Sequence, residues 1–348
     1  MSFGKGYLRM KINDRQIGVN SSVYIIAEAC DNHMGSIDTA KEMCRQAKLA
    51  GCDCIKFQHH LPDEEMLPDV PMTSNFDIPL YEFLKRYALT LNQHKELMDY
   101  CNEIGIQYLC TPFSLKAAWE LNELGVAAFK IGSGEMDDIP TLKAIAKMGK
   151  PMIVSTGMAT MDEIKRTYDV LEGEGIEFAL MNCLSEYPPC YEDVNLGVIE
   201  QMQNEFPKAV IGHSDHTPDL YTSFAAVAKG AKIIEKHVIL DKRTPGPDQS
   251  VSIDFFELRQ LVDGIRKVEA ALGSEKKVHS SEKGIREWAH RSVVSLVDIP
   301  EGTTITQEMI WSKRPGTGIP SYRMDEVIGK VAKREIKANT LVAWEDLG

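Results

Sequence analysis

One unit recurs along the chain: a run with helical spacing ends in glycine, and a short β-rich run follows within a few residues. It occurs six times, at Gly51, Gly105, Gly125, Gly149, Gly175 and Gly230. Glycine just past a helix adopts the left-handed conformation that closes the helix, so each unit carries its own stop signal. Such a chain alternates helices with strands, which predicts an α/β fold.

Two further β-rich runs, residues 23–29 and 209–214, raise the number of expected strands to eight. The strand runs are almost continuously apolar, as in parallel strands covered on both faces. Eight such strands alternating with helices over about 250 residues are typical of a (β/α)8 TIM barrel. The alternative is an open doubly wound sheet, which we disfavour because no glycine-rich phosphate turn follows an early strand.

Helix starts are marked as well as helix ends. Thr160 and Glu163 have the spacing of a capping box, and Thr217 followed by Pro218 predicts an N-cap and first helical residue. These signals place helices between the expected strands, as a barrel requires.

The ends of the chain lie outside the repeat and suggest the domain boundaries. Near the N-terminus a hairpin is expected to turn at Asn13 and Asp14 and to cap the barrel. The expected organisation is an N-terminal hairpin at 1–20, the barrel at 21–273, a polar linker at 274–289 and a small β-rich module at 290–348. The last module is too small to hold much core of its own.

Charge and hydropathy exclude several partners. The chain has 39 Lys and Arg against 51 Asp and Glu, a net charge of −12, and no long basic run. We therefore expect neither nucleic acid nor an anionic membrane as a partner. The first twenty residues lack a signal-peptide core and no long charge-free apolar run occurs, so a cytoplasmic protein is expected. The eight cysteines form no CxxC framework and are interpreted as reduced thiols.

Polar side chains stand at the end of every expected strand. They are Glu28, Lys56, Gln58, Thr111, Lys130, Ser133, Glu135, Ser155, Thr156, Ser185, Ser214, Asp215, His216, Glu235 and His237. Barrel enzymes carry their chemistry at the carboxyl ends of the strands, so these residues predict one site there. The Pro-rich segment 61–83 follows the second strand and is expected at the same face; a disordered surface insertion is the alternative.

Two histidines suggest a metal site. His216 and His237 follow neighbouring strands, which lie about 4.8 Å apart, so both imidazoles can bind one ion. Two nitrogens with oxygen ligands suit Mn²⁺, with Mg²⁺ or Co²⁺ as alternatives, better than a closed structural Zn²⁺ site. A structural role in the core is the alternative for each histidine.

Two lysines suggest an anion site. Lys56 and Lys130 lie on buried strand ends, where an unpaired ammonium group is costly, so each must face a carboxylate or a bound anion. With the surrounding hydroxyl groups they predict a cradle for a small phosphorylated acid. The alternative is that the lysines form internal ion pairs with Glu28 and Glu135.

The chain also resembles a known family along nearly its whole length. The motifs are IIAEACDNHMGS, CIKFQ, CTPFS, FKIGSGEMDDIP, PMIVSTGMATMDEI, CLSEYPPCYEDVNL, IGHSDHT and IIEKHVILDKRTPGPD. They resemble the sialic acid (N-acetylneuraminate) synthase family, which includes legionaminic acid synthases. The tail, with KRPGTGI and VIGK, resembles that family's C-terminal antifreeze-like (SAF) domain.

The resemblance implies an activity: metal-dependent condensation of phosphoenolpyruvate with a 2-acetamido sugar of the N-acetylmannosamine type, giving a nine-carbon 2-keto acid and phosphate. It also implies a homodimer with exchanged domains. The implied phosphoenolpyruvate ligands are Lys56, Thr111, Lys130, Ser133, Ser155, Ser185 and Ser214. The other implied roles are metal binding by His216 and His237, catalysis by Glu28 and Glu235, and sugar binding by Glu135, Asp248, Tyr81 and Arg314, the last in the partner's site.

Two departures from the family's motifs bear on the substrate. The usual AEIGxNHxG reads AEACDNHMG here, which places Cys30 where the motif has glycine, and the usual GYSDHT reads GHSDHT, which places His213 near the expected metal pair. A 2,4-diacetamido-2,4,6-trideoxymannose substrate, giving legionaminic acid, is therefore the first alternative. A metal-dependent sugar isomerase or epimerase is a second alternative, and a non-catalytic ice-binding protein is a third.

Overall fold

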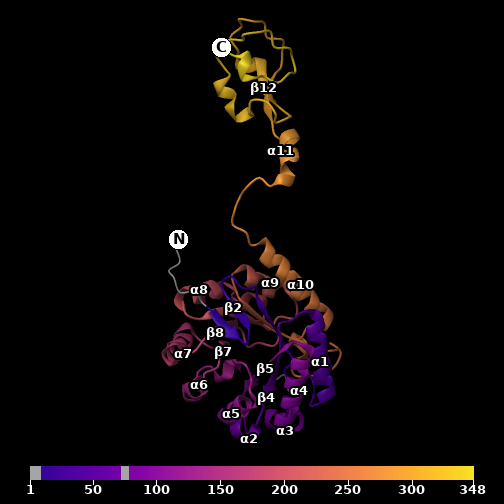
Figure 1. Cartoon of the computed structure of the whole chain (residues 1–348), viewed down its shortest axis with the longest axis vertical. Coiled ribbons are helices and arrows are strands. Elements are labelled where there is room, and N and C mark those ends of the chain that lie inside the picture. The colour runs from indigo at the N-terminus through magenta and orange to yellow at the C-terminus, as the bar shows by residue number, and fades with distance from the viewer. Residues whose placement is uncertain (1–8, 72–77) are drawn as a thin grey trace. The chain divides into compact units, whose positions relative to one another are not determined.

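The computed structural model describes residues 9–71 and 78–348, and the chain divides into two compact units, Met1–Leu272 and Gly273–Gly348. Eight parallel strands form the centre of the first unit (Figure 1). They are β3 (Tyr24–Glu28), β4 (Cys54–His59), β5 (Gln107–Pro112), β6 (Phe129–Ile131), β7 (Met152–Ser155), β8 (Phe178–Cys183), β9 (Val210–Asp215) and β10 (Ile233–His237).

These strands close into a barrel in the order β10-β3-β4-β5-β6-β7-β8-β9. The helices of this unit are α1 (Ile37–Ala50), α2 (Pro62–Glu65), α3 (Leu80–Tyr87), α4 (Leu91–Ile104), α5 (Leu115–Leu124), α6 (Ile139–Ala146), α7 (Met161–Glu174), α8 (Gly197–Glu205), α9 (Tyr221–Ala228) and α10 (Phe255–Ala271). The predicted (β/α)8 barrel is confirmed.

The local signals in the sequence mostly act as expected. Left-handed glycines end α1, α4, α5 and α7, and Thr160 with Glu163 forms the capping box of α7. The helix start predicted at Thr217 is wrong. The Asp215 carboxylate accepts hydrogen bonds from the Thr217 backbone N–H and hydroxyl, at 2.9 and 2.8 Å. This turn delays α9, which begins at Tyr221.

The amino end of the barrel is filled by apolar side chains and a hairpin. Inward side chains near the starts of the strands form one cluster with Met10, Ile12 and Ile17 of the hairpin β1 (Arg9–Ile12) and β2 (Arg15–Gly18). The Lys11 backbone N–H donates to Glu177 and the Asn13 side chain donates to Gln107, at 2.8 and 2.7 Å. The hairpin therefore covers this end of the barrel.

The carboxyl end of the same interior is polar. Because strand side chains alternate, the inward face that begins with Tyr24 and Ile26 continues to Glu28, and the one that begins with Cys54 continues to Lys56. The outward side chains pack against the helices in a separate, larger core. One alternating pattern thus fills one end of the barrel and places charged groups at the other.

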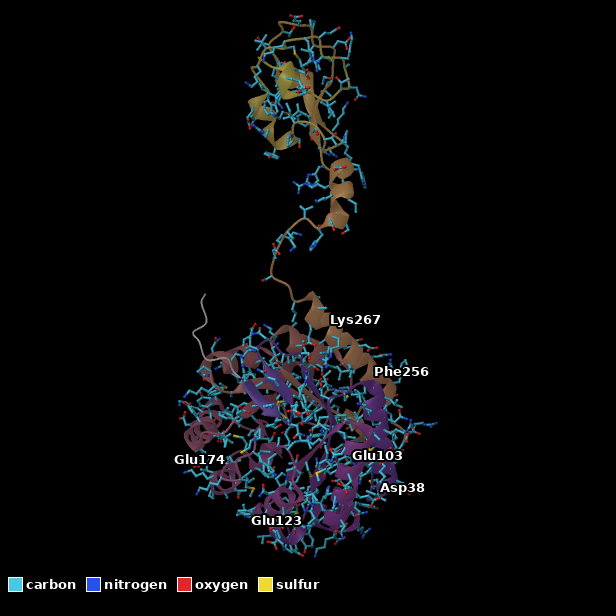
Figure 2. All side chains as sticks on the ribbon, viewed as in Figure 1. Asp38, Glu103, Glu123, Glu174, Phe256 and Lys267 are labelled. Atoms are coloured by element: carbon cyan, nitrogen blue, oxygen red, sulfur yellow. The ribbon has the colours of Figure 1, made fainter. Side chains whose placement is uncertain are left out.

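Charged side chains cover the outside of the helices. Glu103, Glu123 and Glu174 lie on α4, α5 and α7 (Figure 2), and the first two are exposed. None of the helices in the described part of the chain is both long and apolar enough to cross a membrane.

The segment 61–83 differs from the loop expected there. It contains α2, and α3 begins within it, while residues 72–77 lie outside the described residues. Lys116 and Glu64 join α5 to α2 through an ion pair of 2.9 Å. The described part is therefore structured next to strand β4.

The second unit has its own small core. Its elements are η4 (Ser280–Glu282), α11 (Lys283–Ala289), β11 (Ser292–Ser295), η5 (Gln307–Met309), β12 (Ile310–Lys313), η6 (Ser321–Glu326) and η7 (Trp344–Asp346). Strands β11 and β12 pair antiparallel, and residues such as Val293, Ile310 and Val342 form a separate apolar cluster. The stretch 274–289, expected to be a plain linker, carries the helix α11.

Candidate active site

Four charged side chains meet inside the carboxyl end of the barrel. The Lys56 ammonium lies 2.9 Å from the Glu28 carboxylate and 3.6 Å from Glu235, and the Lys130 ammonium lies 3.5 Å from Glu235. All four residues are almost completely buried. Buried charges are tolerated only when paired, so two lysines and two glutamates form a balanced set.

Hydroxyl groups from neighbouring strands complete this cluster. Lys130 Nζ donates to Ser155 Oγ at 2.6 Å, Lys56 Nζ donates to Thr111 Oγ1 at 3.3 Å, and Ser214 Oγ donates to Glu235 Oε1 at 3.0 Å. The structure therefore brings together seven of the residues singled out in the sequence: Glu28, Lys56, Thr111, Lys130, Ser155, Ser214 and Glu235.

The surroundings of Glu28 and Glu235 shift the pKa values of these two carboxylates in opposite directions. Burial and the nearby Glu235 raise the pKa of Glu28 to about 7, against the attraction of Lys56. Burial also acts on Glu235, but Lys130 and Lys56 outweigh it and lower the pKa of that carboxylate. Burial lowers the pKa of Lys130. Groups whose pKa values are driven apart in this way are typical of acid–base sites.

The ion-pair alternative is realised only in part. Lys56 does pair with Glu28, but Lys130 pairs with Glu235 and not with Glu135, among the described residues. Glu135 has a buried carboxylate oxygen with no hydrogen-bond partner in this part of the chain, and burial raises its pKa to about 7. A free acceptor of this kind is available to a ligand.

Gly157, in the loop after β7, lies between two serine hydroxyls. Its backbone N–H donates to Ser133 Oγ at 3.0 Å. A β-carbon added at Gly157 would lie 2.2 Å from Ser185 Oγ and 2.8 Å from Ser133 Oγ, so a side chain there would have to displace these hydroxyls. Ser133 also donates to the Cys183 sulfur at 3.7 Å. Ser133 and Ser185 are thus brought together by a close approach of the backbone.

His216 and His237 lie side by side, as expected from their strands. Their ring centroids are 5.0 Å apart, and the Tyr187 ring stacks on His216 at 4.5 Å. His216 Nδ1 lies 2.7 Å from the Leu184 carbonyl oxygen. Because a carbonyl only accepts, Nδ1 carries the proton and Nε2 keeps its lone pair. Burial lowers the pKa of His216 to about 4, so the ring is neutral near pH 7.

A second set of possible ligands includes one of these histidines. Cys30, His237 and Asp248 each offer a ligand atom, and these atoms all lie within 4.8 Å of one another. His237 Nδ1 is buried and has no hydrogen-bond partner among the described residues. Thiol, imidazole and carboxylate groups are the usual protein ligands of divalent transition metals. The donor set fits a divalent metal ion.

Three residues expected near a sugar lie in different surroundings. Glu135 lies in the turn after β6, within electrostatic reach of Lys130. Tyr81, on α3, donates a hydrogen bond to Asp63 on α2 and lies under Lys85, so the described contacts do not join it to the charged cluster. Arg314 belongs to the second unit, where its guanidinium lies over the Trp288 ring at 5.0 Å.

Gln58 was counted among the strand-end residues without a role of its own, and several other residues of this site were not singled out from the sequence. Gln58 donates to Glu28 at 2.8 Å and also contacts His60 at 3.0 Å, and His60 in turn contacts Glu65 at 3.0 Å. The close approach of the Gly157 backbone to Ser133 and Ser185 was not predicted, and neither was the stacking of Tyr187 on His216. The inward period-two pattern of β4 could have drawn more attention to Gln58, whereas nothing in the sequence pairs His60 with Glu65.

His213 does not join the histidine pair. It contacts the Asn182 carbonyl oxygen at 3.0 Å, and on β9 it alternates with the inward Ser214. It lies on the same strand face as Asp215, which pairs with Lys236 at 3.2 Å. This departure from the family motif therefore changes the outer side of the strand.

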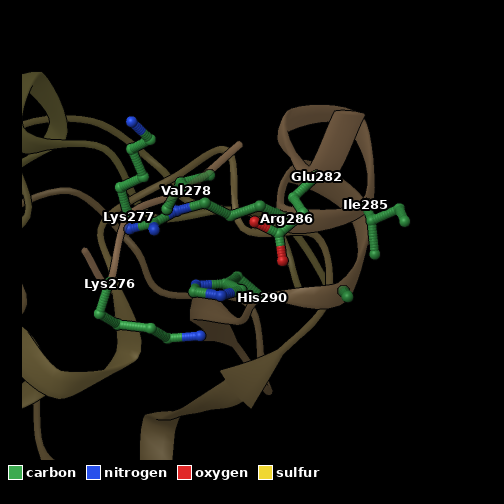
Figure 3. Close-up of a pocket in the computed structure, with 8 residues that line it drawn as sticks. Lys276, Lys277, Val278, Glu282, Ile285, Arg286 and His290 are labelled. Carbon is green, nitrogen blue, oxygen red and sulfur yellow. The ribbon is translucent and has the colours of Figure 1, made fainter. Parts of the chain in front are cut away.

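The second unit has a hollow of a different kind (Figure 3). Its lining residues are Lys276, Lys277, Val278, Glu282, Ile285, Arg286, Ala289 and His290. This lining has one carboxylate and no hydroxyl group. The barrel mouth, with its paired carboxylates and lysines, is the better candidate for catalysis.

A closed (β/α)8 barrel with buried lysines, carboxylates and hydroxyl groups, and with a group of possible metal ligands at its carboxyl end, has the character of an enzyme. Comparison with known proteins gives the particular family. Residues 43–277 match the NeuB family and residues 290–348 match the SAF domain. The chain belongs to the NeuB family, and it is an enzyme of the sialic acid synthase class.

Individual relatives agree. The chain is 38% identical over 327 residues to N-acetylneuraminate-9-phosphate synthase of Homo sapiens, covering 92% of this chain and 90% of that protein. It is 37% identical over 328 residues to N,N'-diacetyllegionaminic acid synthase of Campylobacter jejuni, covering 91% and 98%. The crystal structure of N-acetylneuraminic acid synthetase from Leptospira borgpetersenii, in complex with citrate, has a TM-score of 0.74 at 30% identity and covers 80% and 95% of the two chains.

Proposed function

We propose that this enzyme condenses phosphoenolpyruvate with an N-acylated amino sugar to give a nine-carbon 2-keto acid and phosphate. The substrate we propose is of the N-acetylmannosamine type, and 2,4-diacetamido-2,4,6-trideoxymannose is the alternative, because relatives named for both acids match equally well. The observation that carries the proposal is the buried set of two lysines and two glutamates, ringed by hydroxyl groups, inside the barrel mouth.

Lys56 and Lys130, with Thr111, Ser155 and Ser214, would bind the phosphate and carboxylate of phosphoenolpyruvate. Charge-assisted hydrogen bonds from buried ammonium groups are the strong contacts for such anions. Ser133 and Ser185, held around Gly157, would add two more hydroxyls on the same rim. Binding at several fixed points positions C3 of phosphoenolpyruvate for attack on the sugar aldehyde.

Glu28 would orient the water that completes the reaction, with Glu235 holding the two lysines in place. As C3 forms a bond to the aldehyde carbon, the C2–C3 and aldehyde C–O double bonds become single bonds and the aldehyde oxygen takes up a proton, while C2 becomes electron-poor and takes up the oxygen of that water. The water loses one proton, for which the raised pKa of Glu28 is suited near neutral pH. The resulting hemiketal then releases phosphate by cleavage of its bond between C2 and oxygen.

His216 and His237 would hold a divalent metal ion, which when bound supplies Lewis-acid polarisation of the aldehyde. Mn²⁺ is expected from imidazole and oxygen ligands, with Mg²⁺ or Co²⁺ as alternatives. Glu135 and Asp248 would face the sugar, and Tyr81 is assigned there from the family resemblance alone. Arg314 would bind the N-acyl group in the site of a partner subunit, in a homodimer with exchanged SAF domains.

The experiment that tests this is phosphate release from phosphoenolpyruvate with a divalent metal and one of three sugars: N-acetylmannosamine, its 6-phosphate, or 2,4-diacetamido-2,4,6-trideoxymannose. We expect release with one sugar, which also identifies the branch. In ¹⁸O-labelled water the released phosphate should stay unlabelled, because water attacks carbon. Labelled phosphate, or no release with any sugar at full metal occupancy, would contradict the proposal, and sugar isomerisation without phosphate release would favour an isomerase.

A further inference from the structure

We infer that the thiolate of Cys30 is a direct ligand of the metal ion at the barrel mouth, together with His237 and Asp248. This ligand makes the site prefer a thiophilic ion such as Co²⁺ or Zn²⁺ over Mn²⁺. The inference rests on the metal site of the proposed function and specifies which ion that site selects.

The first support is the convergence of three different ligand groups. Ligand atoms of Cys30, His237 and Asp248 lie within 4.8 Å of one another, a spacing at which one ion can bind all three. Cys30 is fully buried and His237 is 5% exposed, and His237 Nδ1 has no hydrogen-bond partner in the described part of the chain. A buried nitrogen without a partner is costly unless a ligand satisfies it.

The second support is the backbone at Cys30. Its φ angle is 40°, in the left-handed region, where residues with a β-carbon are disfavoured. Glycine, which has no β-carbon, would adopt this conformation without strain. Here the chain carries a strained cysteine instead, and that cysteine points at two other possible ligands. Strain of this kind is found chiefly where a residue has a functional role.

The third support is the chemistry of the set. Imidazole and oxygen groups alone suit Mn²⁺, but a thiolate shifts the preference towards softer ions. Binding breaks the Cys30 S–H bond, forms a metal–sulfur bond and releases the proton to solvent. Asp248 has two carboxylate oxygens, so one can bind the ion while the other contacts the sugar. His216 lies beside His237 and is available as a further nitrogen ligand.

The test uses the full-length protein freed of metal and titrated with Co²⁺. We expect a near-ultraviolet charge-transfer band from thiolate to cobalt. Cys30→Ser should lose this band, and the matched control Cys52→Ala should keep it, because Cys52 is buried before the start of β4, at the other end of the barrel. Bound cobalt without the band in the unmodified protein, or a band that persists in Cys30→Ser, would overturn the inference.

A second measurement needs no variant. X-ray absorption of the zinc-loaded protein should show a sulfur neighbour at about 2.3 Å, and a shell of only nitrogen and oxygen would overturn the inference. In competition experiments Cys30→Ser should weaken Co²⁺ binding roughly tenfold or more and Mn²⁺ binding much less. Equal losses for both ions would contradict selection by sulfur.

Phosphate release, measured on the same samples, separates this inference from the proposed reaction. A sulfur ligand in a protein that does not turn over phosphoenolpyruvate would contradict only the proposed reaction. Turnover supported by a metal ion that has no sulfur ligand would contradict only the role of Cys30.

Discussion

Glu235 contacts both lysines of the charged cluster, Lys56 and Lys130, and this single carboxylate links the two halves of the cluster. Lys56 has Glu28 as a second carboxylate partner, whereas among the described residues Lys130 pairs with one carboxylate, Glu235, and donates to two neutral oxygens, the Ser155 hydroxyl and the Ile131 carbonyl. Lys130 is therefore the lysine with more capacity left for a bound anion, because fewer opposite charges already satisfy it.

Replacing Lys130 with methionine should weaken phosphoenolpyruvate binding roughly tenfold or more, since a charge-assisted contact to the anion is lost. Calorimetric titration with phosphoenolpyruvate measures this. Lys147→Met changes an exposed lysine on the following helix end and should leave the affinity unchanged. Equal affinity in Lys130→Met and the unmodified enzyme would remove Lys130 from the anion site.

Glu135 gives a prediction about pH. Burial raises its pKa from 4.5 to about 7, so between these values the folded protein holds more protons than the unfolded chain. Stability contributed by this group is therefore present at low pH and is lost as the pH rises through 7. The free energy of unfolding should therefore decrease less with rising pH in Glu135→Gln, by up to about 3 kcal/mol, than in the unmodified protein.

Urea unfolding at pH 5 and pH 8 measures the difference. Glu28 and Asp248 also have raised pKa values, to about 7 and about 6, so the comparison must be with the unmodified protein and not with a flat baseline. Glu123→Gln changes an exposed carboxylate and should keep the full pH dependence. If Glu135→Gln also kept the full pH dependence of the free energy of unfolding, the Glu135 carboxyl group would not be its source.

At the scale of elements, the loop after β7 shapes the anion site through its backbone. Gly157 lies so close to Ser133 and Ser185 that any side chain would displace their hydroxyls. Gly212 on β9 shows the same restriction inside the barrel, where an added β-carbon would lie 2.3 Å from the Met181 sulfur. Close approaches of this kind are fixed by packing and leave no mark in the sequence except glycine itself.

Gly157→Ala should weaken phosphoenolpyruvate binding severalfold, because both serine hydroxyls must turn away from the rim. Gly173→Ala is the control, since that glycine lies in α7 with open space around its β-carbon position. It should leave binding unchanged and raise stability by about 0.5–1 kcal/mol, the usual gain from removing glycine within a helix. Unchanged binding in Gly157→Ala would show that the hydroxyls do not contact the substrate.

The elements were predictable because their signals are local. Glycine stops, the capping box and eight apolar runs defined the barrel, and strand ends identified the lysines and glutamates of the charged cluster. The exceptions needed contacts across the fold. Asp215 accepts a hydrogen bond from Thr217, and α9 therefore starts later than predicted. Cys30 and Asp248 lie close together because β3 and β10 pair to close the barrel. Spacing along the chain carries no information about such a pair.

At the scale of the whole molecule, the two units have separate apolar cores, so each can fold around its own residues. Arg314, the one proposed sugar ligand outside the barrel, lies in the smaller unit. The proposal that it serves a partner's barrel makes the number of intact sites depend on how two chains combine.

Co-expression of two inactive variants tests that dependence. Lys130→Met and Arg314→Ala should each be strongly impaired in sugar turnover, while a mixed dimer regains one intact site from two. With random pairing, about a quarter of the unmodified activity should return. If no activity returned when mixed dimers were shown to form, Arg314 would act, at most, within its own chain.

The hairpin at the amino end of the barrel restricts the direction from which substrates enter and products leave. Met10, Ile12 and Ile17 fill the amino end of the barrel, so the described residues leave no route to the charged cluster from that end. In the proposed reaction the small anion binds deepest and the sugar follows it through the same entrance. The proposed reaction would then be ordered: phosphoenolpyruvate would bind before the sugar, and the keto acid would leave before phosphate.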